Sequence, residues 1–275
     1  MFKIIKVFLA IIVFFNLITP VYAAKNRHRH HRSYFTAKSA LLWDITDNKV
    51  YFDKNSQQQV FPASTTKVMT VLLALEKLPL EQYVTVSSRA TQVPQTKLGF
   101  NPGEQYRVSD LIYACLLKSA NDAAGVLAEA VAGSQENFVI MMNQKAWQLG
   151  ASNTRFANAH GLPSKTRQYT TAKDMALIFK EAIKNPFFQK AITFRFRIIY
   201  SKEGRRHFLK SHNKSLFLNW NEGVYGKTGY TRQAQSCFVG YVKKNNHIYI
   251  VDVFGCRKRW EDIKWIIEQK AKVNL

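Results

Sequence analysis

Alternating apolar and polar residues at both ends of the chain predict β-strands. Near the beginning, residues 39–45 (SALLWDI) and 49–54 (KVYFDK) flank the turn Thr46-Asp47-Asn48, a pattern typical of a β-hairpin. Beyond residue 190 the alternation returns. It covers residues 191–200 (AITFRFRIIY), 223–230 (GVYGKTGY), 236–244 (SCFVGYVKK) and 247–255 (HIYIVDVFG). Both ends of the chain therefore contribute strands.

Between these ends the apolar residues recur at helical spacing. Positions 64–78 predict one long buried helix that stops near Pro79. Capping signals mark three further helices, which run through Leu117, through Leu149 with Gly150 at the end, and up to Pro186. Their predicted caps are Ser109, Ser134 and the capping box Thr171–Asp174. A last helix places four apolar side chains on one face. They are Trp260, Ile263, Ile266 and Ile267.

These elements indicate an α/β protein of the α+β type. We expect an antiparallel five-stranded sheet, built from both ends of the chain and flanked by the first and last helices, together with an all-helical lobe at about residues 80–190. A cleft between sheet and lobe is the expected place of a functional site. The chain has no internal repeat and no long linker.

The first 23 residues have the pattern of a secretory signal peptide. Two lysines precede the apolar run 7–18, Pro20 follows, and small residues lead to a cleavage site after Ala23. An uncleaved membrane anchor is the alternative. Residues 24–35 form a basic, histidine-rich tail, which is either a solvated segment, an adhesion arm or an adventitious metal binder. We expect residues 36–275 to form one domain that is exported to the periplasm or cell envelope, soluble or peripherally attached.

The chain is strongly basic. Forty Lys and Arg against 18 Asp and Glu give a formal net charge of +22, which predicts a polyanionic neighbour. An exported protein meets anionic lipids, carboxylate-rich wall polymer and acidic glycans. We therefore expect electrostatic contact with the anionic cell envelope. Because no recognition motif is present, we expect no nucleic-acid partner.

Three cysteines, at positions 115, 237 and 256, are too few for a disulfide scaffold. Cys237 and Cys256 fall on two strand-like segments joined by Asn245-Asn246, and the register that decides whether they pair stays open at this point. The sequence contains no CxxC pair and no HExxH motif. We therefore expect neither a catalytic metal nor a cofactor.

Candidate chemistry begins in residues 61–70 (FPASTTKVMT), where Ser64 and Lys67 lie three residues apart at a helix start. A serine hydroxyl must lose its proton to a nearby base as it attacks, and positions i and i+3 share one helix face. A lysine accepts that proton when burial lowers its pKa, and the apolar residues after Lys67 predict burial. The alternative is an N-cap serine beside a solvated cation.

Two further short motifs follow. Residues 119–121 (SAN) lie at a break between two helices, where a hydroxyl and a carboxamide can project into a cleft; alternatively Asn121 or Asp122 only caps the next helix. Residues 227–229 (KTG) open a strand, and a glycine there often marks close approach of a ligand. The lysine and threonine suit a carboxylate, or the lysine is merely an edge-strand cation.

The three motifs together resemble the penicillin-recognising serine acyl-transferases, which carry S-x-x-K, S-x-N and K-T-G. More closely, the chain resembles the D-alanyl-D-alanine carboxypeptidases among the low-molecular-mass penicillin-binding proteins. Additional matching segments are 153–162 (NTRFANAHGL), 169–176 (YTTAKDMA) and 226–231 (GKTGYT). The resemblance runs from about Ser39 to about Glu268 and implies a β-lactamase/transpeptidase-like fold. Position 120 is alanine here and commonly glycine in relatives.

The resemblance implies a catalytic role for several residues. Ser64 would be the acylated nucleophile, Lys67 its general base, and Ser119 the relay of a proton to the leaving D-alanine. The backbone N–H groups of Ser64 and Tyr230 would form the oxyanion hole. His160 lies in the family's H-G-L segment and has either a role in deacylation or a structural one.

The resemblance also implies substrate-binding residues. They are Asn121, Lys227, Thr228, Gly229, Tyr230 and Arg259. Asn121 would hold the peptide amide of the substrate. Lys227 and Thr228 would bind its terminal carboxylate, and Lys227 would help to lower the pKa of Lys67. Arg259 matches a family arginine that recognises the same carboxylate, or is only a cation at a helix start.

The implied reaction removes the last D-alanine from peptidoglycan pentapeptide stems, through an acyl-enzyme that water hydrolyses. Stem peptides would be the substrate, and β-lactam antibiotics would be covalent inhibitors. Few residues follow Gly229, so we expect no C-terminal β-rich domain. This keeps a D-alanyl endopeptidase of peptidoglycan crosslinks as the alternative.

Two other functions are less favoured by the sequence. A β-lactamase needs a carboxylate to activate the deacylating water, and no Asp or Glu lies between Gly150 and Thr171, so we expect a long-lived penicilloyl adduct. A non-catalytic wall-binding module is expected to lose a motif residue, and none is lost here.

Overall fold

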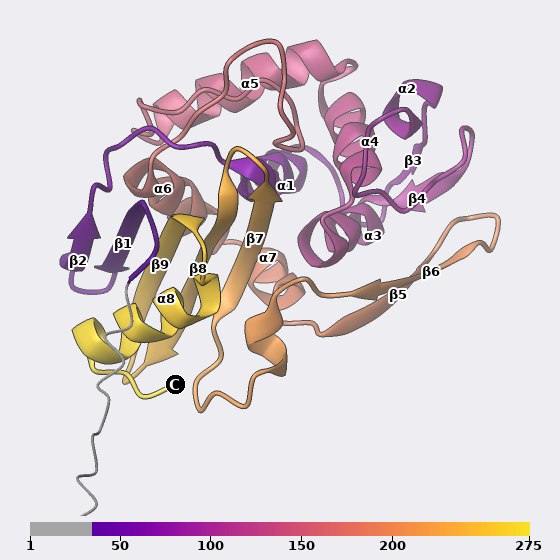
Figure 1. Ribbon diagram of the computed structural model, residues 1–275. Helices are drawn as coiled ribbons and strands as arrows, with labels where there is room; N and C mark the ends of the chain where they lie inside the picture. The colour runs from indigo at the N-terminus through magenta and orange to yellow at the C-terminus, as the bar shows by residue number, and fades with distance from the viewer. Residues whose placement is uncertain (1–34) are drawn as a thin grey trace, which may run out of the picture. The chain divides into compact units, whose positions relative to one another are not determined.

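A five-stranded antiparallel sheet, ordered β2-β1-β9-β8-β7, forms the centre of the computed structural model, which describes residues 35–275 (Figure 1). Its strands are β1 (Ser39–Asp44), β2 (Lys49–Lys54), β7 (Tyr225–Thr231), β8 (Gln235–Lys244) and β9 (His247–Cys256). The N-terminal hairpin thus joins three strands from the last part of the chain, which confirms the predicted sheet. The predicted signal peptide and residues 24–34 of the basic tail lie outside the described residues.

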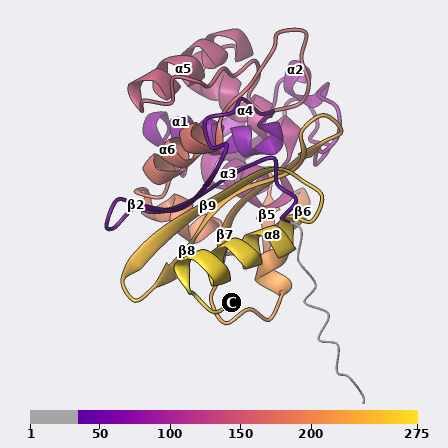
Figure 2. The ribbon, with the colours of Figure 1, turned by 60° about the vertical axis from the view of Figure 1, so that its left-hand side comes forward.

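Helices cover both faces of this sheet. Helix α8 (Arg259–Ile266) packs on one face, and α1 (Lys67–Lys77) and α6 (Ala172–Ala182) pack on the other (Figures 1 and 2). Strand β9 serves both faces because its side chains alternate: Val251 and Val253 join the cluster under α8, whereas Ile250 and Phe254 join the cluster under the other helices. The near-continuous apolar run of β9 therefore reflects burial on both sides.

The lobe beside the sheet is mostly helical. Its helices are α2 (Ser88–Thr91), α3 (Val108–Tyr113), α4 (Asn121–Ala132) and α5 (Gln135–Gln148). It also carries a short antiparallel pair, β3 (Tyr83–Thr85) and β4 (Gln105–Arg107). The prediction of an all-helical lobe is therefore wrong at these two strands, because three residues are too few to show an alternation. No helix in residues 35–275 has both the length and the apolar character needed to cross a bilayer.

Two of the predicted helix caps are confirmed and one is wrong. The side chains of Ser134 and Thr171 accept hydrogen bonds from the third residue of α5 and α6, at 3.1 and 3.0 Å. Ser109, by contrast, lies inside the first turn of α3, which begins at Val108. The first N–H groups of α3 donate to the carbonyls of Gln82 and Leu80, so the preceding loop satisfies them and no side-chain cap is needed.

The predicted strand 191–200 is only half correct. Helix α7 (Pro186–Ala191) is capped by Asn185 and has a proline at its first position. It ends at Ala191, so the first residue of the predicted strand belongs to a helix. The strand β5 (Phe196–Tyr200) begins later and pairs with β6 (Arg206–Lys210) in a separate hairpin, not with the central sheet. The short helical turn Lys214–Phe217 follows it.

The register of the last two strands settles the disulfide question. Ser236 lies opposite Cys256, and a bulge between Ser236 and Phe238 displaces Cys237 from the pairing. All three cysteines are free and buried.

Asp252 is a polar residue in the middle of this core. It is fully buried on β9, and its neighbours across the sheet are Leu41 and Val239. Neither carboxylate oxygen has a hydrogen-bond partner among residues 35–275. Burial raises the pKa of Asp252 well above its usual range, because a charged carboxylate without a partner is costly in an apolar core. Burial therefore favours the protonated form of this side chain in the folded protein.

This protonation makes stability depend on pH. Above about pH 4 the unfolded chain loses the proton that the folded chain keeps, so raising the pH favours unfolding, by up to about 1.4 kcal/mol per pH unit. We expect Asp252→Asn to remove this part of the pH dependence, as measured by urea unfolding at about pH 5 and about pH 7. Glu261→Gln, at an exposed carboxylate of α8, is the control. Equal pH slopes in wild type and Asp252→Asn would contradict a neutral Asp252.

Candidate active site

Ser64 and Lys67 meet at the junction of a tight turn and a helix. Ser64 lies in the 3₁₀ turn Ala63–Thr66, and Lys67 is the first residue of α1. The Lys67 Nζ to Ser64 Oγ distance is 3.3 Å. Lys67 is fully buried, as the apolar residues after it predicted, so it is not a solvated cation. The cap of this turn is Pro62 and not Ser64, which leaves the serine hydroxyl available to the lysine.

Two more oxygen atoms surround the Lys67 amine. Nζ is 2.7 Å from Asn121 Oδ1 and 2.9 Å from the backbone oxygen of His160. A neutral amine has two N–H groups and one lone pair. Both of these oxygens can only accept, so they take the two N–H groups. The lone pair is then left for the third neighbour, the hydroxyl of Ser64.

The electrostatics of the site favour this neutral amine. Burial lowers the pKa of Lys67 to about 8, and the charge of Asp122 opposes the shift. The Asp122 carboxylate is itself engaged by the backbone N–H groups of Leu98, Gly99 and Ala123. A proton acceptor is thus present at mildly alkaline pH.

Asn121 is oriented by a second contact. Its Nδ2 donates to the backbone oxygen of Pro94 at 3.0 Å, which turns Oδ1 toward Lys67. The N-cap of α4 is Ala120, without a side-chain hydrogen bond, so Asn121 does not serve as a cap. In this structure Asn121 holds the lysine, and its predicted contact with a substrate amide stays a prediction.

Ser119 and Lys227 form a second hydroxyl–amine pair. Ser119 has a left-handed backbone (φ +60°) at the end of the π-helical turn Ala114–Lys118, and its Oγ accepts a hydrogen bond from Lys227 Nζ at 2.9 Å. Lys227 Nζ also donates to the backbone oxygen of Thr228. Burial holds the pKa of Lys227 well below its usual range, and the charge of Lys67 lowers it further. The two lysines therefore repel each other when both are charged.

Gly229 allows strand β7 to lie against the catalytic turn. A Cβ atom on Gly229 would lie 3.0 Å from the backbone nitrogen of Ser64 and 3.1 Å from the Cβ of Ala63. Any larger residue would push the strand away from the serine. The predicted oxyanion hole, formed by the N–H groups of Ser64 and Tyr230, requires this close approach.

A cleft of about 290 Å³ opens beside these groups. Its lining residues are Ser64, Thr96, Ser119, His212, Thr228, Gly229, Tyr230 and Arg259. Sequence reasoning missed Thr96 and His212, because each lies on an irregular loop outside the recognised motifs. The pKa of His212 is lowered to about 4 by burial and by neighbouring cations, Lys227 first among them, so this ring is neutral at pH 7.

Arg259 lies at one end of the cleft. Its Nη1 donates to the backbone oxygens of Gly229 and Cys237, at 3.1 and 2.9 Å. Its Nε is buried and has no hydrogen-bond partner among the described residues. Burial lowers the pKa of this guanidinium, which nevertheless remains charged at any pH of interest. A partly unsatisfied buried cation at the wall of a cleft is suited to a carboxylate.

His160 contributes its backbone oxygen to the site. Its ring is buried, and Nδ1 accepts a hydrogen bond from the backbone N–H of Leu162 at 3.2 Å. Burial, and then the charge of Lys67, lower the pKa of His160 to about 3, so the ring stays neutral. The ring is not among the residues that line the cleft, and a role in deacylation stays a prediction.

One group of side chains in residues 35–275 has the spacing of metal ligands: Asp44, Asp47 and His247. The Asp44 carboxylate already accepts from the backbone N–H of Thr46 and lies 2.7 Å from His247 Nδ1. These contacts fasten the β1–β2 turn to the start of β9.

Comparison with known proteins agrees with this arrangement. Residues 25–258 match the family model of peptidase family S11, D-alanyl-D-alanine carboxypeptidase, and the chain belongs to this family of serine peptidases. It is 35% identical over 225 residues to the D-alanyl-D-alanine carboxypeptidase DacF of Bacillus subtilis, covering 80% of this chain and 57% of that protein. The chain thus spans little more than half the length of that relative.

Two further comparisons are informative. A D-alanyl-D-alanine endopeptidase of Pseudomonas aeruginosa is 29% identical over 225 residues, covering 79% of this chain and 71% of that protein. The solved structure of a D-alanyl-D-alanine carboxypeptidase from Mycobacterium tuberculosis superposes with a TM-score of 0.81 at 28% identity, covering 87% of this chain and 92% of that one. The fold is thus that of the penicillin-binding transpeptidases.

The pKa of Lys67 leads to a test by pH. If the neutral amine activates Ser64, the rate of acylation by a fluorescent penicillin rises about tenfold per pH unit below pH 8 and levels off above it. Lys67→Arg keeps the charge but cannot give up its proton, and we expect it to lower the rate by about 100- to 10,000-fold. Circular dichroism over the same pH range controls for unfolding. A wild-type rate that is independent of pH would contradict this role.

Proposed function

We propose that this protein is a serine-type D-alanyl-D-alanine carboxypeptidase that removes the terminal D-alanine from peptidoglycan pentapeptide stems. The observation that carries the proposal is the coordination of Lys67: two acceptor oxygens bind its N–H groups, and its lone pair is left for Ser64. This arrangement supplies a nucleophile with a fully buried base.

In acylation, Ser64 Oγ attacks the carbonyl carbon between the two D-alanines and gives its proton to Lys67. The charge that develops on the carbonyl oxygen is stabilised by the N–H groups of Ser64 and Tyr230. As the C–N bond breaks, the amine of the leaving D-alanine takes a proton through Ser119, and Lys67 becomes neutral again. The product is an ester between the stem and Ser64.

In deacylation, a water molecule gives a proton to Lys67 and attacks the ester carbonyl carbon. The C–O bond to Ser64 breaks, and the serine oxygen recovers a proton from Lys67. The same amine thus serves as the base in both steps, so hydrolysis of the peptide ester needs no carboxylate. A β-lactam ring opens on Ser64 by the same attack, so β-lactam antibiotics are expected to be covalent inhibitors.

The cationic end of the cleft supports the choice of a C-terminal residue. Arg259 and Thr228 both line the cleft, and their cation and hydroxyl can bind the terminal carboxylate. Lys227 lies behind them and is held by Ser119. A cleft that binds a free carboxylate at this end selects the C-terminal residue of a stem peptide.

A D-alanyl endopeptidase is the second candidate, and the relative from P. aeruginosa favours it. It would use the same acyl-enzyme, with the amine of a neighbouring stem as the leaving group. We further propose that the protein is exported and works in the cell envelope, because its first 23 residues have the pattern of a signal peptide and its substrate is found there.

Purified muropeptides distinguish the two candidates. We expect wild-type protein to remove one alanine from monomeric pentapeptides, as measured by mass spectrometry, and to leave crosslinked dimers intact. Splitting of dimers without loss of alanine from monomers would contradict the carboxypeptidase and support the endopeptidase. Ser64→Ala is expected to abolish both activities, whereas Ser88→Ala, at an exposed serine of α2, retains them.

A further inference from the structure

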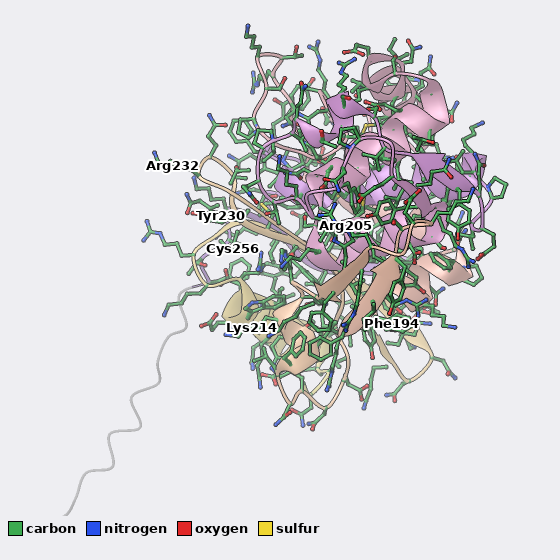
Figure 3. All side chains as sticks on the ribbon, turned by 90° about the vertical axis from the view of Figure 1, so that its right-hand side faces the viewer. Phe194, Arg205, Lys214, Tyr230, Arg232 and Cys256 are labelled. Atoms are coloured by element: carbon green, nitrogen blue, oxygen red, sulfur yellow. The ribbon has the colours of Figure 1, made fainter. Side chains whose placement is uncertain are left out.

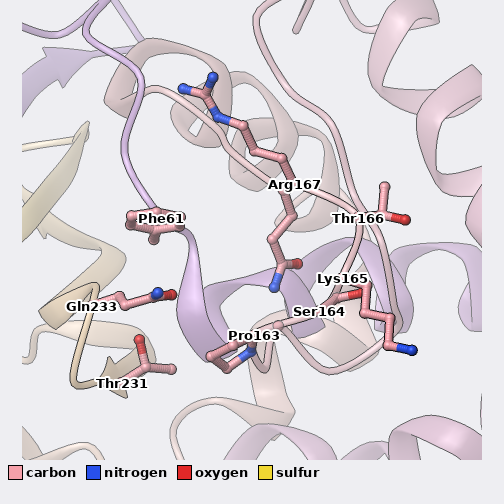
Figure 4. Close-up of a pocket in the computed structure, with 10 residues that line it drawn as sticks. Phe61, Pro163, Ser164, Lys165, Thr166, Arg167, Thr231 and Gln233 are labelled. Carbon is pink, nitrogen blue, oxygen red and sulfur yellow. The ribbon is translucent and has the colours of Figure 1, made fainter.

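A second cavity, of about 220 Å³, lies next to the catalytic cleft (Figure 4). We call it the upstream pocket. Its lining residues are Phe61, Gly161, Pro163, Ser164, Lys165, Thr166, Arg167, Gln168, Thr231 and Gln233. None of the residues of the S-x-x-K, S-x-N and K-T-G motifs belongs to it.

Two chain segments connect the cleft to the upstream pocket. In the catalytic turn region, Ser64 lines the cleft and Phe61 lines the pocket. In strand β7, Tyr230 lines the cleft, and the next residue, Thr231, lines the pocket together with Gln233. The pocket therefore continues the cleft along the outer side of β7, which is the edge strand of the sheet.

The direction of the substrate follows from this order. Under the proposed function, the terminal carboxylate lies at the Arg259 end and the attacked carbonyl lies beside Ser64 and Tyr230. The acyl side of the peptide then has to leave past Tyr230 toward Thr231. An extended peptide advances roughly 3.3 Å per residue, so the residue before the two D-alanines reaches the upstream pocket.

The pocket offers an apolar surface for the aliphatic part of a side chain, and its two cations, Lys165 and Arg167, disfavour a positively charged end. Phe61 is 42% exposed, although it is aromatic and lies three residues before the nucleophile. In Figure 4 it faces Gln233 and Pro163, whereas Lys165 points away from them. No Asp or Glu is among the described residues that line the pocket.

Gln168 adds an acceptor at the pocket wall. Only 5% of this residue is exposed. Nε2 donates to the backbone oxygen of Leu162 at 2.5 Å, which fixes the orientation of the amide, and Oε1 has no partner among the described residues. An unpaired buried acceptor is costly, and a donor on a ligand would relieve that cost.

We propose that the upstream pocket binds the third residue of the stem peptide and so determines which stems are cleaved. This inference rests on the proposed function. The aliphatic part of that side chain packs on Phe61 and Pro163. The amide groups of Gln168 and Gln233 and the hydroxyl of Thr231 bind peptide groups next to it. Phe61 and Gln233 are thus specificity-determining residues.

Two substrates of different length test this. Acetyl-D-Ala-D-Ala ends before the pocket, and diacetyl-Lys-D-Ala-D-Ala reaches it. We expect Phe61→Ala and Gln233→Ala each to lower the ratio of kcat/KM for the longer over the shorter substrate by about tenfold, the size of one lost apolar or hydrogen-bonded contact. Gln57→Ala, at an exposed glutamine of another loop, is the matched control and leaves the ratio unchanged.

The outcomes are separable. A ratio that stays unchanged in both variants would overturn the upstream pocket as a subsite. A fall of both kcat/KM values together would also count against it, because that result indicates a disturbed catalytic turn. If wild-type protein cleaves neither substrate, the proposed function itself fails.

An independent observation concerns the hairpin of β5 and β6. Its inward side chains Ile199 and Leu209 are buried and anchor it. Its outward face, which we call the hairpin face, carries large exposed apolar side chains. They are Phe196 (46% exposed), Ile198 (37%), Tyr200 (52%) and Phe208 (56%). Phe196 and Phe208 stack on each other, so these rings form one patch.

The surroundings of the hairpin face are basic. Exposed Arg206 and Lys210 alternate with Phe208 along β6. Residues 194–217 contain seven Lys and Arg and one Glu. Figure 3 looks onto this side of the molecule, where Phe194, Arg205 and Lys214 are labelled. Exposed aromatic and aliphatic groups flanked by cations match an anionic lipid surface, in which the rings enter the interface and the cations meet the headgroups.

We infer that the hairpin face binds anionic membranes. Co-sedimentation with phosphatidylglycerol/phosphatidylethanolamine vesicles tests it, with the full chain in every variant. We expect Phe196→Ser combined with Phe208→Ser to weaken binding about tenfold or more, because two rings no longer enter the interface. Ile140→Ser combined with Trp147→Ser, at two large apolar side chains of α5 that are at least as exposed, is the matched control and retains binding.

Variants that reverse the charge of the hairpin face form the second part of the vesicle experiment. Arg206→Glu combined with Lys210→Glu is expected to weaken binding to these vesicles and to leave the weak binding to neutral phosphatidylcholine vesicles unchanged. Equal binding by wild type and the Phe196/Phe208 variant would overturn the inference, and so would equal losses in that variant and the α5 control. Capture by purified wall polymer with no binding to vesicles would also overturn it.

Discussion

The active site depends on the coordination of one amine. Lys67 is bound by Ser64 from its own turn, by Asn121 from the helical lobe and by the backbone oxygen of His160 from a long loop. Two of these partners are fixed by a further contact. Pro94 orients Asn121, and the side chain of Asn158 accepts from the backbone N–H groups of His160 and Gly161. The lone pair points at the serine only while lobe, loop and turn are all in place.

The partners of this amine matter as much as its burial. A carboxylate beside Lys67 would hold its proton, because an opposite charge raises the pKa of an amine. Asp122, whose charge acts on Lys67, makes no ion pair with it. Its carboxylate oxygens accept hydrogen bonds from backbone N–H groups instead. The fold satisfies Lys67 and Lys227 with neutral oxygens of amides, carbonyls and hydroxyls. Two fully buried amines are thus kept without a direct ion pair, and both have lowered pKa values.

The sequence predicts features that depend on neighbouring residues, and it does not predict contacts between segments that are far apart in the chain. The three motifs, the five strands of the sheet and the caps at Ser134 and Thr171 follow from spacing and residue type. The sequence predicts Ser109 as a cap because it does not show that the carbonyls of Leu80 and Gln82 reach the start of α3. Thr96 and His212 were missed for a similar reason: only the packing of distant loops brings them to the cleft. The partner strand β6 was missed because its alternation is short.

The position of β7 at the edge of the sheet links the site to its substrate. An inner strand would have both sides paired and could not offer backbone groups to a peptide. Gly229 brings this edge against the catalytic turn, and Arg259 fastens it there by binding the backbone oxygens of Gly229 and Cys237. The same arginine therefore positions the strand and lines the cleft. A change at Arg259 would disturb the nucleophile's surroundings as well as the binding of a carboxylate, so a loss of activity there cannot be assigned to substrate binding alone.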